Sequence, residues 1–266
     1  MIKIAKILMD RNYLLFVFGL LNLIAAVVFL FLMKFLGASN AGNSNFLKPL
    51  KFALSIAVFS WTIAWYVYEL KSQGAITVYS WVVVITLGFE IIYITIQGVR
   101  GQMSHFNTSS PFYASMTIMM GVVASVLTLW TAYIGMLFFT GNVRPMPEYY
   151  LWAIRCSIIL FVIFAFEGGL MGARMSHSVG QIQNDDGLPF LQWSTRIGDL
   201  RVAHFIGMHA LQVIPMLSWY LLKNTKATLV IAFAYALLAT FTLLHALKGQ
   251  SFLNFPHKKI THNTHR

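Results

Sequence analysis

Ionisable side chains interrupt three apolar stretches of this chain. Glu90 lies in one stretch, Glu167 in a second and His209 in a third. An ionisable group at membrane depth costs about 3 kcal/mol, so it normally has a partner or binds a ligand. Carboxylates and imidazoles bind zinc, manganese and iron, and a carboxylate beside a metal acts as an acid or a base. We therefore predict that Glu90, Glu167 and His209 form a deep catalytic and metal-binding group.

A second group of polar side chains lies nearer one end of the same stretches. It is predicted to bind a cofactor, because imidazoles suit zinc, copper or haem iron and several arginines accompany them. Zinc, iron and haem all remain open as cofactors. The predicted cofactor-binding residues are His105, His177, His204, Arg100, Arg174 and Arg201, with Gln97 and Gln212 nearer the deep group.

Helical spacing places some of these residues on common faces. Thr86, Glu90, Tyr93 and Gln97 follow one another at intervals of four, three and four, which indicates one stripe along a helix. With a rise of about 1.5 Å per residue, Glu90 would lie near the bilayer midplane.

The two histidines of the sixth stretch should face different directions. His204 and His209 are five residues apart, which is about 140° around a helix. Counting depth from Arg201, we expect His209 to join the deep glutamates and His204 to join the shallow group. Pro215 should loosen the helix just beyond them.

The composition predicts an all-α, polytopic membrane protein. Of 266 residues, 58% are hydrophobic and only 10% are charged, whereas soluble domains contain about a quarter charged residues. A membrane span needs about 20 apolar residues, and seven stretches satisfy this requirement. We predict one domain over 1–266, a bundle of seven transmembrane helices at roughly 13–36, 49–70, 77–99, 112–140, 149–173, 201–222 and 227–248.

The net charge of +11 does not indicate nucleic-acid binding, because the basic residues are scattered at helix ends. Besides the lipid bilayer, the predicted partner is the anionic lipid headgroup. The basic, histidine-rich tail 255–266 should be disordered and lie along such headgroups.

The ends of the spans define two faces, face A with the N-terminus and face B opposite. Face B carries eleven lysines and arginines against eight on face A, and all eight histidines lie on its side. The positive-inside rule then predicts a cytoplasmic C-terminus and an outside N-terminus. The longest connection, 178–198, is a candidate lid over face B, and Asp199 should cap the next helix.

Three motifs carry a resemblance. The strings RGQMSHFN, DGLPFLQWS and GDLRVAHFIGMHALQ resemble those of an uncharacterised family of bacterial seven-helix integral membrane proteins. The resemblance implies the bacterial inner membrane but no reaction. Ser-His-Ser-Val-Gly is also similar to a string in seven-helix hydrolases related to hemolysin III, but their HxxxH motif is missing here, so their zinc site is not carried over.

Three functions remain open from the residues alone. The first is redox or hydrolytic chemistry at a metal or haem bound near face B. The second is a proton-coupled transporter or channel for a small, possibly anionic solute, in which Glu90 and Glu167 relay protons. The third is a seven-helix sensor or scaffold that binds a protein at face B.

Overall fold

The computed structural model describes residues 2–36, 45–141, 143–181 and 187–252. Within these residues, seven helices are long and apolar enough to cross a membrane, which confirms the predicted fold class. They are α2 (Tyr13–Leu36), α3 (Leu47–Val67), α4 (Gln73–Val99), α5 (Pro111–Leu137), α6 (Glu148–Ala173), α7 (Leu200–Leu217, continued by a π-helical turn, Ser218–Leu222) and α8 (Thr225–Leu247). The predicted tail 255–266 lies outside the described residues.

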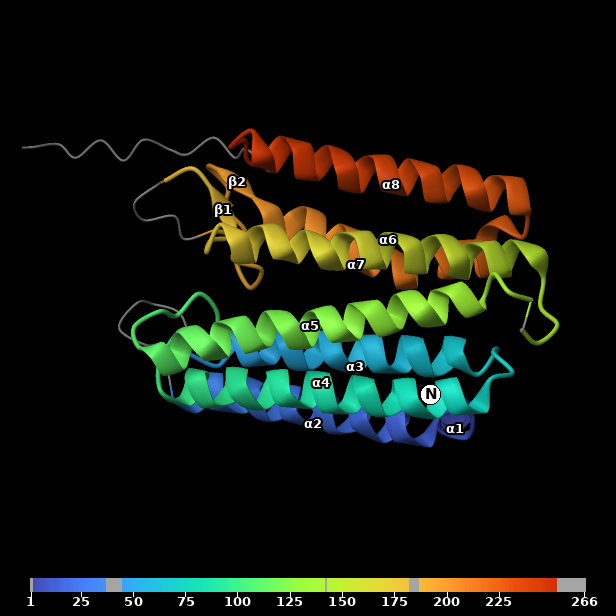
Figure 1. Ribbon diagram of the computed structural model, residues 1–266, viewed down its shortest axis with the longest axis horizontal. Coiled ribbons are helices and arrows are strands. Elements are labelled where there is room, and N and C mark those ends of the chain that lie inside the picture. Colours follow the sequence, from blue (N-terminus) through green and yellow to red (C-terminus); the bar gives the residue numbers. More distant parts are fainter. Residues whose placement is uncertain (1, 37–44, 142, 182–186, 253–266) are drawn as a thin grey trace, which may run out of the picture.

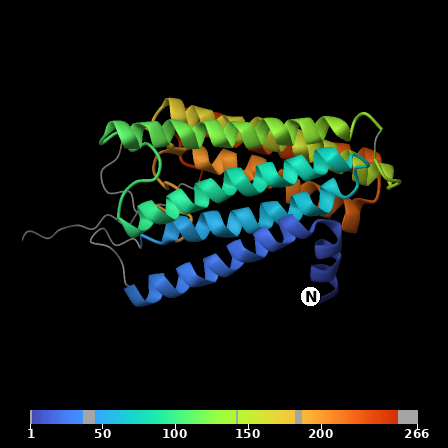
Figure 2. The ribbon, with the colours of Figure 1, turned by 60° about the horizontal axis from the view of Figure 1, so that its bottom comes forward.

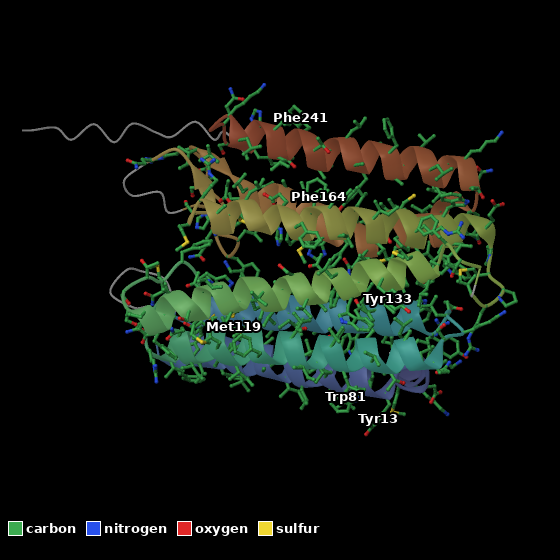
Figure 3. The ribbon with its side chains drawn as sticks, viewed as in Figure 1. Tyr13, Trp81, Met119, Tyr133, Phe164 and Phe241 are labelled. Carbon is green, nitrogen blue, oxygen red and sulfur yellow. The ribbon has the colours of Figure 1, made fainter. Side chains whose placement is uncertain are left out.

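The helices run side by side and alternate in direction, so the connections gather at two ends (Figure 1). Face B is the left end of Figure 1, where α2, α4, α6 and α8 finish. Apolar side chains such as Tyr13, Trp81 and Phe241 point outward and are more than half exposed (Figure 3). An apolar surface of this kind suits contact with a lipid bilayer.

Two groups of helices form the bundle, α2–α5 and α6–α8 (Figure 1). They meet where α5 packs on α6 and where side chains cross between the groups. The Tyr66 hydroxyl donates to the Leu211 carbonyl oxygen, and the rings of Phe59 and Phe161 stack with centroids 5.3 Å apart. The two groups are therefore joined by α5 against α6 and by side chains of α3 that contact α6 and α7.

Small residues allow α6 and α7 to lie close together. A β-carbon added at Gly207 would overlap the ring of Phe164, and one at Gly168 would lie 3.1 Å from His204 Cε1. The register between α6 and α7 therefore places Gly168 level with His204, and Phe164 level with Gly207.

Gly207→Ala is expected to lower the free energy of unfolding by about 1 to 3 kcal/mol, because the new methyl group overpacks the helix contact. Gly169→Ala is the matched control, since a β-carbon there meets nothing within 4 Å. The denaturation midpoints of the two purified variants test this, and equal midpoints would contradict the packing argument.

A short helix, α1 (Ile2–Arg11), precedes the first span and is turned across the direction of α2 (Figure 2). Arg11 joins it to face A, with Nη1 2.7 Å from Glu69 Oε1 and the guanidinium stacked on Trp65 at 4.0 Å. Asn12 Oδ1 then accepts a hydrogen bond from the Leu15 amide at the start of α2. The basic residues before the first span thus belong to a separate helix.

The end of α7 behaves as its proline predicts. Beyond Pro215 the helix widens into the π-helical turn, which stops at Lys223 in the left-handed conformation with φ of 46°. The Ser218 hydroxyl inside this turn lies 2.8 Å from Thr228 Oγ1 on α8. The predicted loosening is therefore confirmed, and it occurs on the face A side of His209.

The two ends of the long connection between α6 and α7 are joined by hydrogen bonds. Two short antiparallel strands, β1 (Ser178–Val179) and β2 (Gly198–Asp199), pair with each other, and α8 packs against both. The Leu200 amide also donates to the His177 carbonyl oxygen at 2.9 Å. These bonds fix where α7 begins relative to the end of α6.

Candidate functional site at face B

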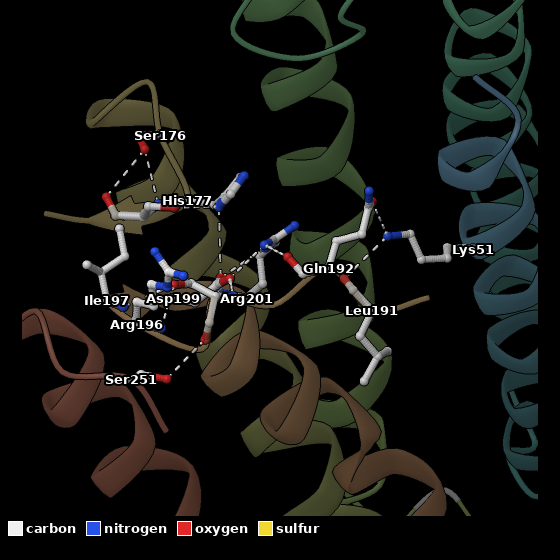
Figure 4. Close-up of polar contacts among 12 residues, drawn as sticks. Lys51, Ser176, His177, Leu191, Gln192, Arg196, Ile197, Asp199, Arg201 and Ser251 are labelled. Carbon is white, nitrogen blue, oxygen red and sulfur yellow. Dashed lines mark hydrogen bonds and ion pairs between the residues drawn. The ribbon is translucent and has the colours of Figure 1, made fainter. Parts of the chain in front are cut away.

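Asp199 lies at the centre of the polar contacts on face B (Figure 4). It caps α7, as predicted, because its Oδ1 accepts from the Arg201 amide at 3.0 Å. Its carboxylate also accepts from Arg201 Nε at 2.9 Å, from Arg201 Nη2 at 2.6 Å and from the Ser194 amide at 2.9 Å. The side chain is almost fully buried, so Asp199 organises the site as well as capping the helix.

His177 approaches the same carboxylate from the end of α6. Its Nδ1 lies 3.9 Å from Asp199 Oδ1 and 3.0 Å from Ser178 Oγ. Burial lowers the pKa of His177, Arg201 lowers it further, and Asp199 opposes both effects. His177 therefore presents a neutral imidazole at neutral pH.

Lys51 connects the α6–α7 loop to α3. Its Nζ donates to Gln192 Oε1 at 3.0 Å and to the Leu191 carbonyl oxygen at 3.4 Å (Figure 4). The loop is held from the other side by Arg201, whose Nη2 donates to the Gln192 carbonyl oxygen. Segment 188–193 thus crosses face B between the two groups of helices, where we predicted a lid; residues 182–186 of that connection lie outside the described residues.

A pocket opens beside this loop, with a volume of about 330 Å³. Polar side chains from the end of α6, the loop and the start of α7 line it. They are His177, Ser178, Gln181, Gln192, Ser194 and Arg201.

Lys48 lies one turn before Lys51 and contacts His105, which follows α4. Its Nζ is 3.1 Å from His105 Nδ1, and it is the charge that acts on the Glu90 carboxylate. Burial, followed by the charge of Lys48, lowers the pKa of His105 to about 3. His105 is therefore neutral and can accept a hydrogen bond from the lysine.

The predicted stripe on α4 faces the protein interior. Thr86, Glu90, Tyr93 and Gln97 are all buried, with Glu90 8% exposed. Gln97 Nε2 donates to the Tyr93 hydroxyl at 2.9 Å, whereas Gln97 Oε1 is buried and has no hydrogen-bond partner among the described residues. Helical spacing alone thus predicted this stripe correctly.

Glu167 on α6 pairs with His204 on α7. His204 Nδ1 lies 3.3 Å from Glu167 Oε2 and 2.6 Å from the Phe164 carbonyl oxygen. Both carboxylate oxygens of Glu167 are buried, and neither has a hydrogen bond among the described residues. Our division into layers differs from the structure here, because His204 and not His209 reaches this carboxylate.

His209 faces α3 and the loop. Its Nδ1 lies 3.1 Å from Gln212 Oε1, and Gln212 Nε2 donates to Thr62 Oγ1 at 3.0 Å. The His209 ring packs on Phe205 with centroids 4.2 Å apart, and Phe205 in turn contacts Trp193 of the loop. The two histidines of α7 therefore face different directions, as their spacing predicts.

The remaining predicted cofactor-binding residues, Arg100 and Arg174, are exposed at the ends of α4 and α6. The two arginines do not line the pocket, unlike Arg201. Positions at helix ends are typical of arginines that reach the headgroup layer.

The structure does not bring Glu90, Glu167 and His209 together as a metal site. Within the described residues, no group of three or more histidine, cysteine, aspartate or glutamate side chains could hold a metal ion. Each member of the predicted group has a different neighbour: Lys48 for Glu90, His204 for Glu167 and Gln212 for His209. A bound metal or haem therefore stays a prediction from sequence.

Sequence reasoning missed the roles of Lys48, Lys51 and Gln192. A lysine near a helix start commonly extends to the headgroups, yet the side chain of Lys48 lies beside His105 and that of Lys51 donates to the loop. Their signal was a pair of lysines three residues apart on one face of a helix, with no acidic residue nearby in sequence to neutralise them.

Comparison with known proteins adds no assignment, since no family model matches the chain and neither a curated protein nor a solved structure matches it.

Proposed function

We propose that this integral membrane protein is a proton-coupled transporter or channel for a small anionic solute, with its solute entrance at face B. The observation that carries the proposal is the buried carboxylate of Glu167, whose ionic neighbour is His204. A buried carboxyl group with one titratable neighbour suits the uptake and release of a proton within a membrane.

The hydrogen bond of His204 identifies which nitrogen can exchange this proton. The Phe164 carbonyl oxygen is only an acceptor, so Nδ1 of His204 carries a hydrogen and donates it at 2.6 Å. Nε2, and not the Nδ1 that lies 3.3 Å from Glu167 Oε2, is then the nitrogen that can take up a further proton, so the proton does not pass between the two side chains through that contact. With one exchangeable proton, the pair is neutral, as glutamic acid with imidazole or as carboxylate with imidazolium. Without that proton, a negative charge remains at membrane depth, which is costly.

The charges at face B support an anionic solute. Lys48, Lys51 and Arg201 lie close enough to influence one another electrostatically, and Asp199 is the carboxylate in direct contact with this group. A region lined by one sign of charge raises the local concentration of the opposite ion. An anion is therefore the solute that this region favours.

The experiment is a flux measurement on the full chain in liposomes that contain a pH-sensitive dye. The membrane potential is clamped, and phosphate, sulfate, nitrate or chloride is added outside. We expect at least one anion to produce proton entry above the rate of protein-free liposomes. Proton entry equal to the protein-free rate for all four anions would reject the proposed function.

We further propose that the protein lies in the bacterial inner membrane with face B cytoplasmic. The family resemblance and the excess of basic residues at face B support this orientation. In a Cys156→Ser background, a cysteine introduced at Lys248 on face B should react only after the membrane is permeabilised. One introduced at Lys71 on face A should react in intact cells, and the reverse pattern would invert the topology.

A further inference from the structure

The two lysines at the start of α3 contact neutral groups. Lys48 Nζ lies beside His105 Nδ1, and Lys51 Nζ donates to Gln192 Oε1 and the Leu191 carbonyl oxygen. Among the described residues, no carboxylate oxygen lies within 4.0 Å of either ammonium group. Two partly buried ammonium groups without an anionic partner are costly, and a bound anion would remove that cost.

Arg201 supplies a third cation, oriented by Asp199. Its Nε and Nη2 donate to the two carboxylate oxygens, while Nη1 makes no hydrogen bond among the described residues. Arg201 also lines the face-B pocket. Because Asp199 fixes the guanidinium plane, Nη1 is pre-oriented for a ligand at little entropic cost.

The charge of this region fits an oxyanion. Lys48, Lys51 and Arg201 contribute three positive charges, and Asp199 and Glu90 are the acidic groups that act on them. The net charge is therefore +1 when Glu90 is ionised and +2 when it carries a proton. A phosphate anion of charge −1 to −2 matches this excess, and lysine and arginine are the usual side chains that bind it.

The pocket supplies neutral donors as well as charge. His177 and Ser178 line it, and Gln192, which also lines it, accepts a hydrogen bond from Lys51. A volume of about 330 Å³ lies at the lower end of the range for small-molecule sites. Lys51 does not line the pocket itself, but its Nζ donates to the side chain of Gln192, which does, so its ammonium group lies beside the pocket.

We propose that the face-B pocket binds a phosphate group, held by Arg201 and Lys51 with His177 and Ser178 as further donors. The site lies where α6 ends and α7 begins. At the end of a membrane span, both phospholipid headgroups and dissolved phosphate can reach it. The proposal rests on the proposed transport function only in naming its substrate, because binding can be measured without flux.

The test measures binding to the full chain in nanodiscs of zwitterionic lipid. Inorganic phosphate should raise the unfolding temperature saturably, compared with chloride at equal ionic strength. Lys51→Gln should weaken binding about tenfold or more, because it removes a charge-assisted hydrogen bond. Lys71→Gln is the matched control, since Lys71 is exposed on face A.

A second arm separates the two sources of phosphate. Nanodiscs that contain phosphatidic acid should stabilise the wild type more than Lys51→Gln if the ligand is a lipid headgroup. In the phosphate-bound protein, the pKa of His177 should rise, because the anion offsets the cations that lower it.

The proposal is overturned if neither phosphate nor phosphatidic acid distinguishes the wild type from Lys51→Gln. Phosphate binding without anion-driven proton entry would keep the site and reject the transport function. Proton entry driven by another anion, without phosphate or phosphatidic acid binding, would keep the transport function and reject the phosphate site.

Discussion

Replacing Glu167 by glutamine is expected to lower anion-driven proton entry into proteoliposomes about 100-fold or more, the usual range for loss of a proton-transferring side chain. Glutamine keeps the size of the side chain but cannot take up or release a proton. Its partner His204 is 28% exposed and retains its hydrogen bond to the Phe164 carbonyl oxygen. The Glu167–His204 pair then no longer exchanges a proton through the carboxyl group.

The matched control for this substitution is Glu148→Gln. Glu148 begins the same helix but is exposed on face A, so proton entry should be unchanged. The unfolding temperature of Glu167→Gln should change little, because glutamine is the uncharged counterpart of the glutamic acid in the neutral form of the pair. Full proton entry by a folded Glu167→Gln variant would exclude this carboxylate as the proton carrier.

The spans could be predicted from sequence because a membrane helix is recognised by the length and hydropathy of its apolar stretch. The α4 stripe around Glu90 was also predictable, because helical spacing alone decides which residues share a face. Both inferences depend on one helix at a time. They need no knowledge of how two helices are shifted or rotated relative to each other.

The partner of Glu167 was not predictable in this way. The prediction that His209 lies level with Glu167 assumes that the end of α6 and the start of α7 lie at the same depth. In the structure Arg174 is exposed, whereas Arg201 is drawn inward by Asp199. Because Glu167 pairs with His204, the two helices are shifted by three to four residues, about 5 Å, relative to that assumption.

The glycine contacts between α6 and α7 show the true register. Gly168 packs on His204 and Gly207 packs on Phe164, so Glu167 is level with His204. The short strands β1 and β2 fix this shift, because they set where α7 starts. No hydropathy or spacing pattern encodes that position, since it depends on the path of the loop between the helices.

The contacts of Gln192 with Lys51 and Arg201, which connect α3 with α7 across face B, could not be predicted from sequence either. Lys51 and Gln192 lie 141 positions apart in the chain, and each has an ordinary interpretation by itself. A lysine at a helix start commonly extends to the headgroups. Only the fold brings Gln192 between Lys51 and Arg201 and thereby connects α3 with α7.

Asp199 is the residue whose loss should destabilise face B most. Asp199→Asn is expected to lower the free energy of unfolding by about 2 to 3 kcal/mol, because it leaves the Arg201 charge without its carboxylate partner. The carboxylate accepts hydrogen bonds from two Arg201 side-chain nitrogens and from the amides of Arg201 and Ser194. Asparagine offers one acceptor oxygen and turns an NH₂ group toward the remaining donors.

Chemical denaturation of the purified chain at fixed detergent concentration measures this effect. Asp10→Asn provides the control, since Asp10 is exposed on α1 and its change should cost less than about 0.5 kcal/mol. The loss of Asp199 should also release the loop, because Arg201 then no longer holds the Gln192 carbonyl oxygen in place. Protease cleavage within 187–193 should therefore become faster in Asp199→Asn. A variant with wild-type stability and wild-type cleavage would show that Asp199 caps α7 and does not organise face B.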